Sequence, residues 1–155
     1  MPLPNRALVL VLDGRKLLFF RNSGDENQID LRTEAHDQRA DAKDSDLKTD
    51  APGVQQQSGG YGRSTMEETD FHQLEEDNWV KDAADQLKRR ALANDFQHLC
   101  IIAPPKALGV LRKALHKEVE RRITCTINKE MSGRPTPDIE ALIVAETAAK
   151  EPADV

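Results

Sequence analysis

The opening stretch RALVLVLDGRKLLFFRN, residues 6–22, decides the fold. Residues 6–13 form a near-continuous apolar run, which is typical of a central strand covered on both faces. Asp13-Gly14 is a strong signal for a two-residue turn, because both central positions of a type I′ turn need a positive φ. Residues 16–22 then return as the antiparallel partner. The stretch therefore predicts a β-hairpin whose first strand lies inside a sheet.

The chain beyond the hairpin shows two further periodic patterns. Residues 29–36 alternate between apolar or small side chains and polar ones, which predicts a half-exposed third strand. Apolar residues at helical spacing predict an amphipathic helix that ends near Asn94; they are Trp79, Val80, Ala83, Ala84, Leu87 and Ala91. Residues 96–103 (FQHLCIIA) then predict another buried strand.

The C-terminal part completes an alternating order of strands and helices. Pro104-Pro105 ends the previous strand and suits the first turn of a helix, whose apolar face is marked by Leu108, Leu111 and Leu115. Residues 120–127 predict a strand, and Thr136-Pro137 begins a last helix. The order β-β-β-α-β-α-β-α predicts one α/β domain with a mixed sheet, an antiparallel meander followed by β-α-β. This is the strand order of ribonuclease-H-like folds.

Length and charge set limits on the organisation and the partners. The 155 residues suit one domain, which we expect to span residues 1–147 with a frayed tail at 148–155. The net charge of −5 argues against broad nucleic-acid binding, although a local basic patch is compatible with it. No apolar run approaches the roughly 20 residues of a membrane span, and the N-terminal run is too short for a signal peptide. We therefore expect a cytoplasmic protein without membrane insertion.

The two cysteines, Cys100 and Cys125, both lie in apolar segments that predict strands. In a reducing cytoplasm each is most simply a small buried apolar residue. The sequence contains no CxxC pair and no Cys/His spacing of a zinc site. We therefore expect two buried thiols and no redox role.

Residues 38–63 have few large apolar side chains and predict a long flexible loop. The loop ends in SGGYGR, residues 58–63. Gly59 and Gly60 permit close backbone approach to a partner, Tyr61 offers a ring for stacking, and Arg63 offers a charge for phosphate. A plain linker explains the same residues, so both interpretations stand. No G-K-[ST] follows the glycines, which excludes a P-loop.

Residues 64–79 (STMEETDFHQLEEDNW) predict a capped helix start rich in acids. Negative charge near a helix N-terminus is stabilised by the helix dipole, which accounts for these acids without a metal. Asp70 and His72 together allow an acid/base, metal or binding role, and a solvent-exposed histidine is the alternative. The H-E-x-x-H signature is absent, because Glu76 occupies the position four residues after His72.

No complete catalytic constellation is visible. The interior of the first strand has no carboxylate for Mg²⁺, and no serine or cysteine shows a neighbouring base. Lys106 at a helix N-terminus is suited to an anion, with further basic residues at Arg112, Lys113 and Lys117, and His116 follows that helix. Solvated surface charges are the alternative. We therefore expect binding residues and no catalysis, cofactor or metal.

Three segments together resemble a known bacterial family. They are RALVLVLDGRKLLFFRN at residues 6–22, STMEETDFHQLEEDNWVKDAADQL at 64–87 and LCIIAPPKALGVLRKALHKEV at 99–119. In this order they resemble the host attachment family, known as "protein required for attachment to host cells", over residues 3–142. That family is grouped with bacterial relatives of archaeo-eukaryotic peptide-chain release factors and shares the ribonuclease-H-like middle domain.

The resemblance implies two functions of different classes. The first is a non-enzymatic role in attachment to host cells through a protein partner, indirect because nothing directs export. The second is a ribosome- or tRNA-associated factor. In release factors a glycine-glycine-glutamine loop enters the peptidyl-transferase centre and promotes ester hydrolysis; here Gly59-Gly60 is followed by Tyr61. A hydrolase that uses His72 and nearby acids is a third alternative.

Overall fold

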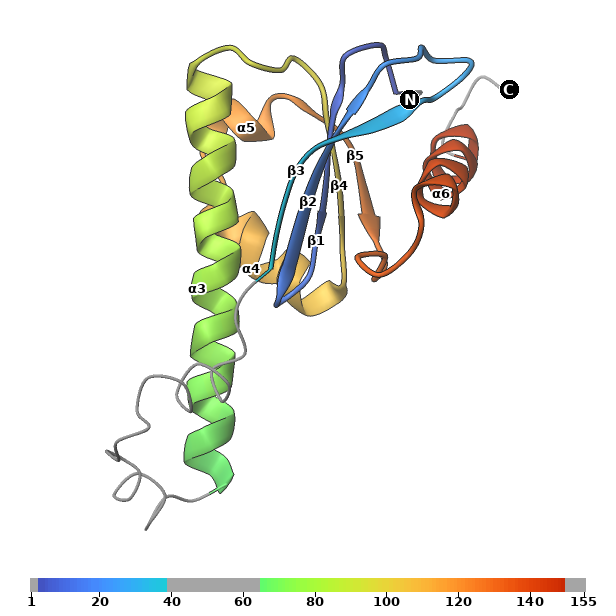
Figure 1. The fold of residues 1–155 in the computed structure, drawn as a ribbon. Helices are drawn as coiled ribbons and strands as arrows, with labels where there is room; N and C mark the ends of the chain where they lie inside the picture. Colours follow the sequence, from blue (N-terminus) through green and yellow to red (C-terminus); the bar gives the residue numbers. More distant parts are fainter. Residues whose placement is uncertain (1–2, 39–64, 150–155) are drawn as a thin grey trace.

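The computed structural model describes residues 3–38 and 65–149 (Figure 1). Five strands and four helices make up this part of the chain. The strands are β1 (Leu8–Leu12), β2 (Lys16–Asn22), β3 (Leu31–Gln38), β4 (Leu99–Ala103) and β5 (Ile123–Asn128). The helices are α3 (Thr65–Leu92), α4 (Pro105–Ala114), α5 (Lys117–Glu120) and α6 (Thr136–Ala149).

The strands form one mixed sheet in the order β3-β2-β1-β4-β5. The strands β1, β2 and β3 are antiparallel neighbours, and Leu10 lies opposite Phe19 in the hairpin. Strand β4 pairs in parallel with β1 on one side and with β5 on the other. The predicted single α/β domain, with an antiparallel meander followed by β-α-β, is confirmed.

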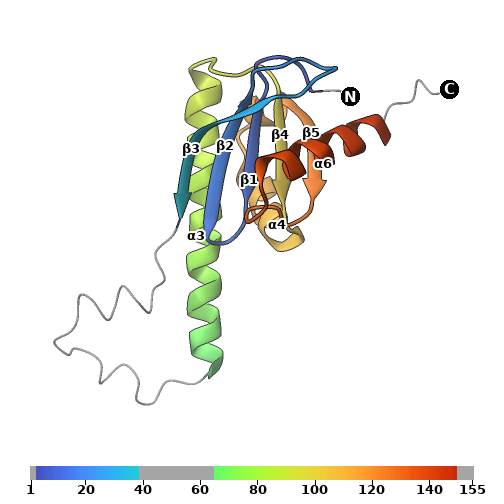
Figure 2. The ribbon, with the colours of Figure 1, turned by 45° about the vertical axis from the view of Figure 1, so that its right-hand side comes forward.

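Helices cover both faces of the sheet, and every residue of β1 is buried. Leu8, Leu10 and Leu12 belong to the core under α3, α4 and α5, whereas Val9 and Val11 belong to the core under α6. Figures 1 and 2 show these layers, with α6 across the face opposite to α3. The continuous apolar run of β1 is therefore explained by burial on two faces.

Helix α3 is longer than the sheet that it covers. Its 28 residues correspond to about 42 Å, and its N-terminal turns project past the end of the sheet (Figures 1 and 2). Among the side chains of α3 that the structure describes, from His72 on, the buried ones run from Val80 to Ala91. The helix ends as predicted near Asn94, whose φ of 58° is the left-handed conformation common after a helix.

Strand β3 differs from the prediction of a half-exposed strand. Leu31 is buried, but the remaining residues through Gln38 are all exposed, including Thr33 and Ala35. The reason is position, because β3 is the edge strand of the sheet. A period-two pattern indicates a strand but does not reveal which strands the helices cover.

The segment after α4 also differs, because the predicted strand at 120–127 begins at Ile123. One helical turn, α5, precedes it. The Nδ1 atom of His116 accepts a hydrogen bond of 3.0 Å from the backbone N–H of Glu118, which caps this turn. Val119 fills the core from the turn and is completely buried.

The expectation of two separate thiols is wrong in this structure. Cys100 of β4 and Cys125 of β5 are direct neighbours in the sheet and are joined by a disulfide. Both sulfurs lie in the core under α6. The pairing depends on the parallel register of two strands, which the separation of 25 residues along the chain does not reveal.

None of the described helices combines the length and the apolar character that crossing a bilayer requires.

Candidate functional site

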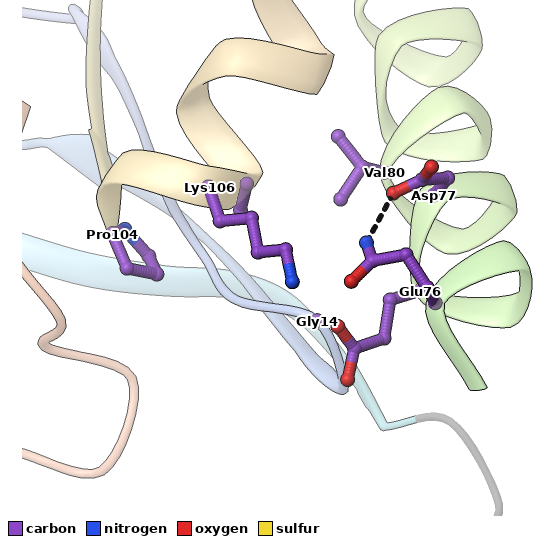
Figure 3. Close-up of a pocket in the computed structure, with 8 residues that line it drawn as sticks. Gly14, Glu76, Asp77, Val80, Pro104 and Lys106 are labelled. Carbon is purple, nitrogen blue, oxygen red and sulfur yellow. Dashed lines mark hydrogen bonds between the residues drawn. The ribbon is translucent and has the colours of Figure 1, made fainter. Parts of the chain in front are cut away.

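A small cleft lies where the central parallel strands end. In open α/β sheets, ligands bind at the carboxyl ends of the strands. Here β1 is followed by Gly14 and β4 by Pro104, and the long helix α3 faces both (Figure 3). The cleft has a volume of about 90 Å³ and is lined by Gly14, Gln73, Glu76, Asp77, Val80, Pro104, Lys106 and Ala107.

The cleft contains charges of both signs. Lys106 extends from the first turn of α4 toward α3, where Glu76 faces it (Figure 3). Beside Glu76 on α3, Gln73 Nε2 donates a hydrogen bond of 2.7 Å to Oδ1 of Asp77, one helical turn further along the chain. The volume lies well below the roughly 300–1,000 Å³ of pockets that enclose drug-sized ligands. The cleft is therefore suited to a single polar group and not to a nucleotide.

Gly14 allows the hairpin and α3 to approach one another. A Cβ atom at this position would lie 3.0 Å from both Cγ and Cδ of Glu76. This contact is tighter than ordinary van der Waals packing. The glycine of the turn thus has a second role, since it brings Glu76 to the end of β1.

Asp13 is held in place by two sets of hydrogen bonds. Its Oδ1 accepts from the backbone N–H groups of Arg15 (2.7 Å) and Lys16 (2.6 Å), which stabilises the hairpin turn. The predicted type I′ conformation is wrong, because neither Asp13 nor Gly14 has a positive φ; the carboxylate of Asp13 stabilises the turn instead. Its Oδ2 accepts from the hydroxyl of Ser132, which also contacts Oε1 of Glu130 at 2.8 Å. Burial raises the pKa of Asp13, but these hydrogen bonds outweigh it and the pKa lies below its ordinary value.

The structure describes some of the predicted site residues and not others. Gly59, Gly60, Tyr61 and Arg63 lie outside the described residues, and of Asp70 the structure describes the helical backbone alone. His72 is exposed on α3, one turn before Glu76. Lys106 is exposed and lines the cleft, and His116 caps α5. Their roles in binding remain predictions.

Gln73, Glu76 and Asp77 were missed by the sequence reasoning as site residues. Their spacing places them on one face of α3 together with buried Val80, and this pattern is readable from the sequence. The contact of Ser132 with Asp13 has no such signal, because 119 residues separate them.

A family comparison places this fold among known proteins. The model of the family described as "Bacterial archaeo-eukaryotic release factor family 12" matches residues 6–143. The chain belongs to this family. The match begins just before β1 and ends within α6, so it includes the whole sheet of the family 12 protein. No curated protein matches the chain.

The family assignment confirms one part of the resemblance. The kinship with archaeo-eukaryotic release factors is shown by the match over residues 6–143. The comparison does not bear on the host-attachment name, which remains a prediction.

Proposed function

We propose that this family 12 protein is a ribosome- or tRNA-associated factor that acts from the cytoplasm by binding and without hydrolysis of its own. The family match over residues 6–143 supports the kinship with release factors. The strand order β3-β2-β1-β4-β5, with β2 antiparallel to its neighbours, supports a ribonuclease-H-like assignment, as in the release-factor middle domain.

The observation that carries the proposal is the reach of α3. The N-terminal turns of α3, before the cleft residue Gln73, project from the body of the protein (Figure 2). The sequence Gly59-Gly60-Tyr61 precedes the first residue of α3 by a few positions. A projecting helix that follows this sequence is suited to carrying it into a deep site on a large particle. The ribosomal centre that release factors enter is such a site.

Tyr61 supports a binding role over a hydrolytic one. The release-factor motif has glutamine at the position after the two glycines, and this chain has tyrosine. A tyrosine ring stacks on a nucleobase regardless of base identity, and Arg63 adds a charge for phosphate. Tyr61 and Arg63 therefore supply contacts to RNA without supplying the glutamine of the motif.

The attachment role is the second candidate. It rests on the resemblance of residues 6–22, 64–87 and 99–119 to the host attachment family. A cytoplasmic protein would support attachment indirectly, through effects on the synthesis of other proteins. This role and the ribosomal role are therefore compatible.

The test is binding of the purified full chain to purified bacterial ribosomes, measured as a dissociation constant at fixed salt. We expect saturable binding, weakened severalfold or more by Tyr61→Ala and retained by Tyr61→Phe, because phenylalanine keeps the stacking ring. Peptide release from peptidyl-tRNA on the same particles should stay at the uncatalysed rate. Absence of binding by the unmodified chain would overturn the proposal, and accelerated release would overturn its non-hydrolytic part.

A further inference from the structure

Helix α4 presents a basic outer face. Burial of Ala107, Leu108 and Leu111 fixes its inner face. At 100° per residue, Gly109 lies on the opposite side, with Lys106, Arg112 and Lys113 within about 60° of it. All four residues are exposed. Lys117, the first residue of α5, is also exposed and adds a further positive charge.

None of these cations forms an ion pair within 4.0 Å in the part of the chain that the structure describes, although Lys106 extends toward Glu76 in the cleft. Lys106, Arg112, Lys113 and Lys117 take part in none of its ion pairs, and residues 104–117 contain no aspartate or glutamate. By contrast, Arg21, Arg90 and Arg122 are all paired with carboxylates. A chain with a net charge of −5 thus carries a local basic group on α4 at Arg112 and Lys113, with Lys106 and Lys117 at its two ends.

Gly109 leaves the centre of this face bare. A Cβ atom built at Gly109 meets nothing within 4 Å, so the backbone is open to solvent. Glycine disfavours a helix interior relative to alanine, and here no neighbouring atom requires it. The result is a flat strip of backbone between basic side chains, which a large partner can approach closely.

We propose that this face, formed by Lys106, Gly109, Arg112, Lys113 and Lys117 and here called the α4 basic face, docks on the phosphate backbone of structured RNA. The inference rests on the proposed ribosomal function and names the surface that contacts the RNA. Phosphate recognition needs cations on an accessible surface and no specific pocket. Helices α3 and α4 cover the same face of the sheet, so both can meet one particle (Figure 1).

The chemistry of the face favours RNA over a protein or a membrane. Protein interfaces are usually anchored by aromatic or other large side chains, and a helix lying on a membrane inserts an apolar face. The large exposed apolar residues of the described part are Leu74, Leu92 and Val144, and none lies on α4. The apolar side of α4 is already buried against the core.

The sharpest test compares Gly109→Glu with Gly109→Gln. Both side chains fit the open space at Gly109 and differ in charge alone. Binding is measured to purified ribosomes and to protein-free ribosomal RNA. We expect Gly109→Glu to bind both about fivefold to tenfold more weakly than Gly109→Gln, because its carboxylate would face phosphates. Equal affinities of the two variants would overturn the inference.

A second pair of variants tests the cations themselves. If the four basic residues each meet a phosphate, the affinity of the unmodified chain should fall about 50- to 150-fold between 50 and 200 mM salt. Replacing Lys106, Arg112 and Lys113 by Gln should lower the salt slope by the contribution of about three phosphate contacts. The control replaces Lys81 on α3 and Lys129 and Arg134 in the loop between β5 and α6, all exposed, and should keep the slope.

The outcomes separate this inference from the function on which it rests. If the unmodified chain binds ribosomes and both triple variants show the same salt dependence of binding, the RNA-docking role of the α4 basic face is overturned and the proposed ribosomal function stands. If the unmodified chain binds no ribosomes, the proposed function fails, and the inference fails with it. Binding to ribosomes with no binding to protein-free RNA, and with Gly109→Glu as weak as expected, would identify an acidic ribosomal protein as the partner and overturn the RNA assignment.

Discussion

At the scale of single residues, two arginines and two carboxylates form a network of ion pairs at the end of the sheet opposite the cleft. Glu34 Oε2 and Oε1 accept from Arg21 Nε (2.8 Å) and Arg90 Nη2 (2.6 Å). Asp95 Oδ2 accepts from Arg21 Nη2 (3.0 Å) and Arg90 Nε (2.8 Å). Arg90 also lies 4.8 Å from the ring centroid of Phe19. The network ties β2, β3 and the end of α3 together.

This network predicts a loss of stability in acid. Burial raises the pKa values of Glu34 and Asp95, but hydrogen bonds and charge from Arg21 and Arg90 outweigh it, so both lie below their ordinary values of 4.5 and 3.8. Groups with a lowered pKa in the folded state contribute stability that is present above the unfolded pKa and is lost as pH falls through the folded pKa. The free energy of unfolding should be steady above pH 5 and fall below about pH 4.5.

Urea unfolding from pH 7 to pH 3 measures this effect. The double variant Glu34→Gln with Asp95→Asn should be less stable at pH 7 and should lose less stability in acid than the unmodified protein. An identical acid dependence of the two proteins would show that other carboxylates are responsible.

Trp79 gives a second prediction at this scale. Its indole Nε1 is buried and has no hydrogen-bond partner among the described residues, while its ring packs against the core under α3. Trp79→Phe should change the free energy of unfolding by less than about 1 kcal/mol, because it removes an unsatisfied donor. Trp79→Ala should cost about 2 kcal/mol or more through lost packing. Unfolding is followed by far-UV circular dichroism, because both variants lack Trp79, the single tryptophan, and with it the tryptophan fluorescence signal. Equal losses of unfolding free energy in the two variants would contradict the prediction.

At the scale of elements, local patterns predicted what local physics determines. The hairpin depends on side-chain hydrogen bonds of Asp13 to the turn, although its turn type was predicted wrongly. The helix start at Pro105 and the stop at Asn94 depend on backbone conformations that these residues favour. Long-range features were missed. The exposure of β3 depends on its place at the edge, and the helical turn before β5 depends on Val119 filling the core.

The residues of the candidate site likewise include some that local sequence predicts and some that only tertiary packing brings there. Lys106 was predicted because proline at a helix start and a following lysine are adjacent in sequence. Glu76 reaches the cleft because Gly14 lets α3 approach the hairpin, which requires tertiary packing. The partners of Asp13 across the sheet were likewise invisible in the sequence.

The disulfide between β4 and β5 gives a prediction for these two elements. Closing a loop of 25 residues should stabilise the protein by about 3.5 kcal/mol through the entropy of the unfolded chain. Urea unfolding with and without a reductant should show this loss for the unmodified protein. The double variant Cys100→Ala with Cys125→Ala should be insensitive to reductant. Thiol titration of the unfolded oxidised protein should find no free thiol, and two free thiols would contradict the pairing.

At the scale of the whole molecule, the body and the projecting part of α3 have separate tasks in our account. The buried side chains in the described part of α3 run from Val80 to Ala91 and pack it on the sheet. Inserting a seven-residue alanine-rich segment after Phe71 would lengthen the projection by about 10 Å and nearly preserve its rotation. We expect unchanged thermal stability and loss of ribosome binding. Unchanged binding would show that the reach of α3 has no role.

Sucrose-gradient sedimentation of the native protein from a cell lysate, at low and at higher salt, tests the central claim most directly. Our account predicts co-migration with ribosomal particles at low salt, weakened at higher salt and abolished when residues 59–63 are deleted. Sedimentation at the top of the gradient at both salt concentrations would contradict it, and the indirect attachment role would then have to operate without the ribosome.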